Sequence, residues 1–129
     1  MWFKDAIGRE KIDHMFAGNF PLEDVQLESL TFHGSKDLRL QFLCKNIPGV
    51  VPDKWRRQRY NAISLTFSMI NIYSLNIQGG EIGFVCAPRL STCSEKSVLN
   101  IENCNFKLDC ESRFLVVEGF TPYIDERWG

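Results

Sequence analysis

The stretch Tyr60–Gly80, YNAISLTFSMINIYSLNIQGG, contains no charged residue. Its polar side chains alternate with apolar ones, which is the two-residue period of a β-strand with one buried face. The stretch is long enough to raise the question of a membrane span, but this alternation favours strands over a membrane helix. A phase shift near Ser68–Asn71 predicts either a turn or a β-bulge, and the sequence does not decide between them. Gly79-Gly80 predicts a tight turn at its end.

The chain upstream of this stretch predicts a helical element. At 129 residues we expect a single domain, 1–129, which can bury a core without disulfides or metals. Apolar residues with helical spacing indicate one broken helix or two short ones within residues 2–17. Gly18 and Pro21 would then end any helix.

A β-hairpin is predicted next. Residues 25–32 alternate with a slip near Glu28, which indicates a strand carrying a bulge. Turn-forming residues occupy 33–37, and residues 38–44 alternate cleanly again. Two alternating segments around a short turn favour an antiparallel pair.

Further strands are predicted after Gly80. Residues 82–86 indicate a short strand, the polar residues 89–97 a loop, and residues 99–110 one or two strands. Residues 114–117 are apolar on both faces and suit a central strand, and the tail after Gly119 could fold back onto the sheet edge. The sum predicts an α+β fold, with a short N-terminal helical element and about seven mainly antiparallel β-strands.

Charge is unevenly distributed along the chain. Residues 1–30 and 93–129 each carry a net charge of −3, residues 31–92 carry +5, and the whole chain carries −1. A near-neutral chain is unlike a general nucleic-acid binder, which is usually basic. If the acidic ends meet in the fold, they would form a face that attracts a basic partner.

The sequence offers no catalytic or phosphate-binding motif. The G-x-S-x-G, P-loop and dinucleotide patterns are absent, and the histidines, His14 and His33, are far from each other and from any cysteine in sequence. Adjacent carboxylates such as Glu23-Asp24 point apart and favour solvated surface charge. Cys93, in a polar loop, is the least buried candidate nucleophile, but it lacks a neighbouring base. We therefore expect no enzyme, no cofactor and no metal.

The five cysteines favour a reduced protein. Their number is odd and none form a C-x-x-C pair, which is a poor disulfide framework. Four lie in apolar runs, where a free cysteine behaves as a small hydrophobic residue: Cys44, Cys86, Cys104 and Cys110. We therefore expect a cytoplasmic protein.

A cationic cluster surrounds a single tryptophan after two prolines. Lys54-Trp55-Arg56-Arg57-Gln58-Arg59 follows Pro48 and Pro52 and precedes the uncharged stretch. Cations beside an aromatic ring suit single-stranded nucleic acid, whereas the structural interpretation is a loop whose Trp55 packs inward. One short cluster in a near-neutral chain favours the structural interpretation.

The order of these features resembles that of the bacterial immunity protein 50 family, from polymorphic-toxin and contact-dependent inhibition systems. The resemblance covers residues 2–78, and its most specific part is Pro52-x-Lys54-Trp55 followed by Asn61. It implies a protein that binds and neutralises one cognate toxin domain, a nuclease in many such systems, as a monomer in a 1:1 complex. Pro52, Lys54, Trp55 and Asn61 are expected to hold the fold.

Toxin contact is expected on the acidic ends, because a nuclease cleft is basic. The candidate acidic residues are Glu10, Asp13, Glu23, Asp24, Asp125 and Glu126, with Tyr123 and Trp128 as aromatic hot spots. Two alternatives stay open at this point. One is a small enzyme or accessory domain with a dispersed site, and the other is a nucleic-acid-binding module that uses the Arg56–Arg59 cluster.

Overall fold

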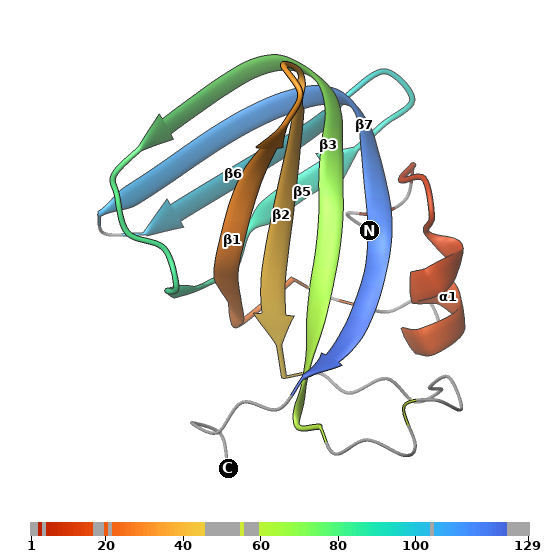
Figure 1. Ribbon diagram of the computed structural model, residues 1–129. Coiled ribbons are helices and arrows are strands. Elements are labelled where there is room, and N and C mark those ends of the chain that lie inside the picture. Colours follow the sequence, from red (N-terminus) through yellow and green to blue (C-terminus); the bar gives the residue numbers. More distant parts are fainter. Residues whose placement is uncertain are drawn as a thin grey trace.

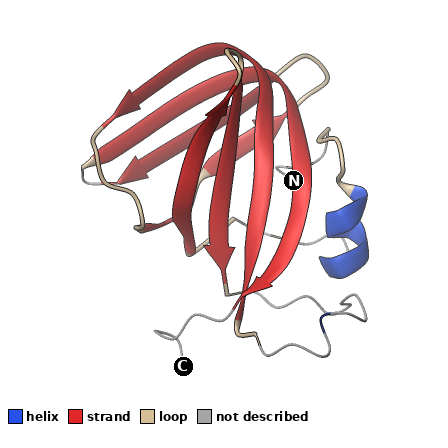
Figure 2. Cartoon of the chain, in the orientation of Figure 1, coloured by secondary structure: helices blue, strands red, loops and turns tan. Residues whose placement is uncertain are grey.

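One antiparallel sheet and one short helix account for the regular structure in the part of the chain described by this computed structural model, namely residues 3, 5–16, 20, 22–45, 55, 60–103 and 105–123. Figure 1 and Figure 2 show the helix beside the sheet. The elements are α1 (Glu10–Phe16), β1 (Val25–His33), β2 (Asp37–Cys44), β3 (Ala62–Gln78), β4 (Val85–Cys86), β5 (Arg89–Thr92), β6 (Ser97–Asn103) and β7 (Phe106–Tyr123). The strand order is β4-β1-β2-β3-β7-β6-β5.

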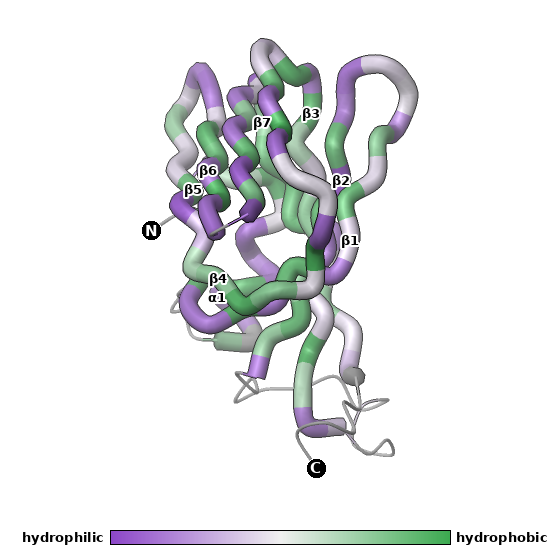
Figure 3. The backbone as a smooth tube through the Cα atoms, turned by 90° about the vertical axis from the view of Figure 1, so that its left-hand side faces the viewer, coloured by the Kyte–Doolittle hydropathy of each residue, from purple (hydrophilic) through white to green (hydrophobic). Residues whose placement is uncertain are grey.

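Two long strands, β3 and β7, hold the sheet together. They pair from Ala62 opposite Tyr123 to Gln78 opposite Lys107. The first half of β3 also pairs with β2, whereas the first half of β7 pairs with β6. The sheet therefore consists of two halves that share the β3–β7 pair, and Figure 3 shows β5 and β6 on one side and β1 and β2 on the other.

The bend between the halves lies where the β3–β7 register changes. One register shift falls between Ile72 and Ser74, and Asn71 has a φ of 58°. Asparagine tolerates this left-handed conformation better than most residues, because its short polar side chain can bond locally. The phase shift near Ser68–Asn71 is thus a bulge inside one continuous strand, as one of the two sequence interpretations had it.

The core lies between the two halves of the sheet. Leu38 faces Met69 and Leu115 across three strands, and Leu40 likewise faces Phe67. All of these side chains are fully or almost fully buried. The opposite face of this half is more polar, and Gln41 there accepts a hydrogen bond from Ser29 and donates one to Ser64.

The N-terminal segment covers an otherwise open edge of β7. The Ile7 N–H donates to Leu115 O at 2.8 Å, and Val117 N–H donates to Ile7 O at 2.7 Å. Helix α1 follows and buries Ile12 completely. At its end, Phe16 packs edge-on against Phe20, with ring centroids 4.5 Å apart.

The sequence predicted much of this arrangement. The α+β class, the predominantly antiparallel strands and the 25–44 hairpin are confirmed. The slip near Glu28 is also confirmed, since the β1–β2 register shifts between Leu27 and Ser29. The helix is shorter than the range 2–17, because Ile7 forms a β-bridge and Gly8, with a φ of 86°, does not have a helical conformation.

Three strand predictions were wrong. Residues 89–97 were expected to form a loop but contain β5, where Leu90 alone of four residues is buried, too few to give a period of two. The strand expected over 82–86 is reduced to Val85–Cys86. Residues 119–123 are not a separate return segment, because they continue β7 and pair directly with β3.

Replacing Gly8 by Ala is expected to lower the free energy of unfolding by about 2 kcal/mol or more. A Cβ at this position would lie 2.6 Å from Val117 O, inside the paired backbone. Gly34→Ala is the matched control, because Gly34 also has a positive φ but its Cβ would meet open space. Urea unfolding measures the free energy of unfolding of both variants. Equal losses in the two would show that the approach of the new Cβ to Val117 O does not destabilise the protein.

Candidate partner-binding surface

The described residues form no cluster that could hold a metal ion. No three His, Cys, Asp or Glu side chains among them are close enough to hold an ion. His14 on α1 and His33 at the end of β1 are both exposed. None of the described helices is long and apolar enough to cross a membrane. The candidate site is therefore sought on the surface.

The thiols of the described part of the chain are free, and most are held neutral. Burial raises the pKa of Cys44 to about 12 and those of Cys86 and Cys110 to about 11, with the charge of Glu111 adding to the effect at Cys110. Cys93 is exposed, and its Sγ lies 3.2 Å from Lys96 O. The expectation of core thiols holds for Cys44 and Cys110, is half met at Cys86, and for Cys104 lies outside the described residues.

The bend of the sheet carries an open hollow of about 340 Å³, which we call the bend hollow. It combines two cations, two aromatic rings and an amide, with no acidic side chain in its lining. The lining residues are Lys36, Asn71, Ile72, Tyr73, Arg113 and Phe114.

Backbone hydrogen bonds fix the shape of the bend hollow. The Asn71 N–H donates to Asp37 Oδ1 at 3.1 Å, and the Ile72 N–H donates to Lys36 O at 2.8 Å. The turn between β1 and β2 is therefore tied to β3 at the point where β3 bends. This contact brings Lys36 to the rim of the hollow.

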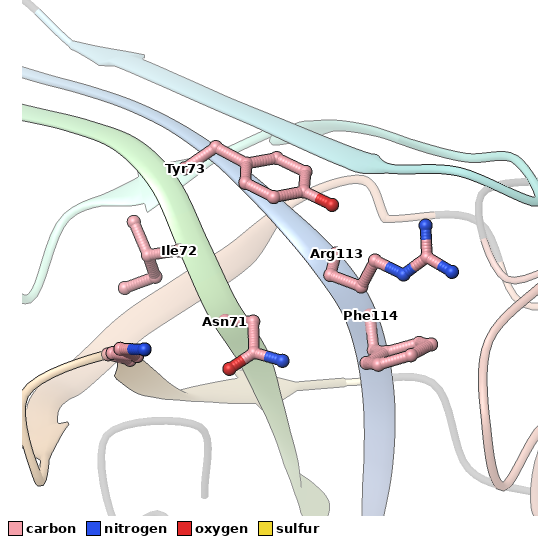
Figure 4. Close-up of a pocket in the computed structure, with 6 residues that line it drawn as sticks. Asn71, Ile72, Tyr73, Arg113 and Phe114 are labelled. Carbon is pink, nitrogen blue, oxygen red and sulfur yellow. The ribbon is translucent and has the colours of Figure 1, made fainter.

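The side chains of the bend hollow are unusually exposed for their type. Tyr73 is 58% exposed and Phe114 is 38% exposed. The Arg113 guanidinium carbon lies 5.3 Å from the centre of the Phe114 ring, within cation–π range. Figure 4 shows Tyr73, Arg113, Phe114 and Asn71 grouped over the neighbouring strands β3 and β7. Tyrosine and arginine are the residues that most often anchor protein interfaces.

The predicted acidic residues lie on separate elements. Glu10 and Asp13 are exposed on α1, where Asp13 forms an ion pair with Arg9 at 3.2 Å. Glu23 and Asp24 are exposed just before β1, and Asp24 has a φ of 51°. The helix lies beside β7, whereas β1 is separated from β7 by β2 and β3, so the two acidic pairs do not belong to one element.

The remaining predicted contacts can be placed only in part. Tyr123 ends β7, opposite Ala62 of β3, but its side chain lies outside what the structure describes. Asp125, Glu126 and Trp128 also lie outside the described residues, and their role as toxin contacts stays a prediction.

The tryptophan of the cationic cluster is a core residue. Trp55 is only 3% exposed, and its ring packs edge-on against Tyr60 at 5.8 Å. Asn61 is half-buried and directly precedes β3. The structural interpretation is therefore confirmed for Trp55. Six other residues of the motif and its cluster lie outside the described part of the chain: Pro52, Lys54, Arg56, Arg57, Gln58 and Arg59.

Comparison with known proteins identifies the family. A family model, Immunity protein 50, matches residues 8–123. The chain belongs to this family. The match extends well beyond residues 2–78, over which the order of sequence features resembles the family, and includes β4 to β7. No curated protein and no solved structure matches the chain.

Trp55→Ala is expected to destabilise the protein by about 3–5 kcal/mol, because it removes a large buried ring. Trp55→Phe keeps an aromatic ring against Tyr60 and should lose clearly less. Chemical denaturation measures both variants. A fully stable Trp55→Ala protein would contradict the structural role of the motif.

The buried thiols predict a loss of stability in alkali. Unfolded Cys44 ionises near its ordinary pKa of 9.0, whereas the folded thiol stays neutral up to about pH 12. The contribution of the neutral Cys44 thiol to the free energy of unfolding is complete below pH 9 and falls as the pH rises from 9 towards 12. The cause is that the unfolded state gains a favourable ionisation that the folded state lacks. Urea midpoints at pH 8 and pH 10.5, under reducing conditions, should fall less in Cys44→Ala than in the parent protein; identical falls would contradict the prediction.

Proposed function

We propose that this protein neutralises one cognate toxin domain by binding it tightly, and that it catalyses no reaction itself. The observation that carries the proposal is its membership of the immunity protein 50 family over residues 8–123, a range that includes every strand of the described sheet. The exposed tyrosine, phenylalanine and arginine of the bend hollow support a binding role, since these residue types anchor interfaces.

We further propose the class of the toxin and the setting of the complex. The partner is the C-terminal toxin domain of a contact-dependent inhibition or related polymorphic-toxin system, and its activity is that of a nuclease. The complex forms in the cytoplasm of the producing cell, with one copy of each chain. Exposed acidic residues support a basic partner of the nuclease type, because substrate clefts for nucleic acid are positively charged.

In this proposal the exposed acidic residues attract the toxin electrostatically and so speed its association. Glu10, Glu23 and Asp24 are exposed to solvent. Exposed charges add little to the final affinity, but they raise the rate of association with an oppositely charged surface. Steering of this kind does not need the acidic pairs to lie in one contact patch, since the field acts over about 8 Å at physiological salt.

The test of the proposed function is co-expression of the chain with the open reading frame next to its gene. We expect the chain to restore growth to cells that express the neighbouring toxin domain and to co-purify with it at a 1:1 ratio. Growth arrest in the presence of well-expressed, folded chain, with no complex recovered, would refute the function itself.

Charge reversal before β1 tests the steering role. The double variant Glu23→Lys, Asp24→Asn should slow association with the toxin domain by about tenfold at low salt, with the dissociation rate little changed. Asparagine is chosen at position 24 because the φ of 51° disfavours lysine. Glu102→Lys, an exposed change on β6, is the matched control.

Stopped-flow association measured from low to high salt should bring the two variants together as screening grows. An association rate equal to that of the parent at every salt concentration would remove these residues from the proposed surface.

A further inference from the structure

The second half of β3 is an open sheet edge within the described structure. From Ser74 to Gln78, β3 pairs with β7 on one side only, and Tyr73 is the bulged residue that directly precedes them. Its pairing with β2 ends at Met69, and the β1–β2 turn reaches no further than Ile72. Figure 1 shows this part of β3 along the rim of the sheet, with β7 beside it. Six residues therefore present one row of backbone N–H and C=O groups without a neighbouring strand.

The other described edges are blunted in ways that this one is not. The second half of β7 is met by Ile7 at Leu115–Val117, and beyond that contact it carries Glu118 and Pro122. The edge of β1 is met over Val25–Leu27 by the two-residue strand β4 and by Phe84 O, which accepts a hydrogen bond from the Leu27 N–H at 3.2 Å. Beyond these contacts its outer edge is interrupted by a bulge at Glu28, whose side chain is charged. At the far side, β5 has four residues, follows Pro88 and carries Arg89. Short strands, proline and charge are the devices by which proteins protect sheet edges.

The composition of the open edge invites pairing. Residues 73–78, YSLNIQ, contain no charge and no proline. Leu75 and Ile77 pack against the core from one face but are only partly buried, and Tyr73 is 58% exposed. A neutral, half-apolar edge of this length is a ready template for an added strand, the mode of recognition in which backbone bonds give affinity and side-chain pockets give specificity.

The bend hollow adjoins this edge and favours a partner that brings a negatively charged group. Tyr73 belongs both to the edge and to the hollow, and Lys36 and Arg113 supply two cations there. Asp37 borders the hollow, with its Oδ1 accepting from the Asn71 N–H, but the lining itself contains no acidic side chain. An incoming carboxylate would therefore meet two cations, and an arginine can hold a carboxylate through two parallel hydrogen bonds.

We propose that a strand of the cognate toxin domain adds to the edge of β3 over residues 73–78, with an acidic side chain at one end of that strand entering the bend hollow to meet Lys36 and Arg113. This inference rests on the proposed function and names the surface that holds the toxin. A six-residue strand spans about 20 Å, which is ample for a register of several backbone hydrogen bonds. Tyr73 would be the aromatic anchor where strand and hollow meet.

Charge complementarity favours a toxin strand over a second copy of this chain. In a pairing of two β3 edges, the strand laid against residues 73–78 would come from the same uncharged stretch, Tyr60–Gly80. That segment contains no carboxylate to place between Lys36 and Arg113. A partner strand with an acidic residue satisfies both the edge and the hollow.

The holding surface is far from the steering residues. Glu23 and Asp24 precede the start of β1, whereas the hollow lies beyond its other end, past the turn at Lys36. Nine residues of strand separate the two, or about 30 Å at the usual rise. Substitutions at the two places therefore report on different events, association at one and dissociation at the other.

Amide hydrogen exchange, measured residue by residue, tests the strand pairing without any substitution. The chain is compared alone and in complex with a catalytically inactivated form of the neighbouring toxin domain. In a paired strand only alternate N–H groups face the edge. We therefore expect alternate amides within residues 73–78 to exchange fast in the free chain and to become protected in the complex. Unchanged exchange along this segment in a complex that has formed would overturn the inference.

Two substitutions test the hollow. Arg113→Glu and Tyr73→Ala should each weaken binding of the same toxin domain by about 30-fold or more, mainly through faster dissociation, as expected for interface anchors. Arg89→Glu, an exposed cation on β5, is the matched control and should bind like the parent. Thermal unfolding of each variant confirms that the fold is intact.

The outcomes separate this inference from the proposed function. Parent protein that fails to bind or protect refutes the function. Parent protein that binds, together with Arg113→Glu and Tyr73→Ala proteins that bind equally well, refutes the docking surface alone. A stable dimer of the free chain, detected by light scattering and with the edge amides already protected, would assign the edge to a second copy.

Discussion

The pairing of β3 with β7 is the constraint on which the rest of the structure depends. These two strands run side by side from Ala62 opposite Tyr123 to Gln78 opposite Lys107, and every other strand attaches to one or other of their halves. The bulge between Ile72 and Ser74 lets one continuous ladder serve two packed halves, so that a single sheet encloses its own core. The same bulge turns Tyr73 outward beside Arg113, and so creates the surface assigned to the toxin.

Sequence periodicity predicted the strands whose two faces differ in polarity. In β2, Leu38, Leu40 and Phe42 are fully buried while Arg39 between them is exposed, and this contrast is visible in the sequence alone. It fails at β5, where only Leu90 is buried, and at the end of β7, where residues 119–123 lack a run of apolar residues and yet pair with β3. Tertiary pairing overrides local pattern in both places.

Sequence periodicity did not predict the bend hollow. Lys36 and Tyr73 are ordinary residues of a turn and of a strand, and nothing in their spacing places them beside Arg113. Their proximity follows from the bend at Asn71 and from the bond between the Ile72 N–H and Lys36 O, both of which are tertiary features. The burial of Trp55, by contrast, followed from weighing one cationic cluster against the near-neutral charge of the whole chain.

The long separation in sequence between the two central strands has a consequence for how the protein is made. A ribosome adds about 5–20 residues per second, so β3 waits roughly 2–9 seconds after its synthesis before the last residues of β7 follow. During that interval β3 lacks its β7 partner, and its uncharged second half, beyond the pairing with β2, has no neighbouring strand on either side, which favours aggregation. Folding of this chain during translation would therefore depend more on chaperones than folding of a helical protein of the same length, whose contacts form locally.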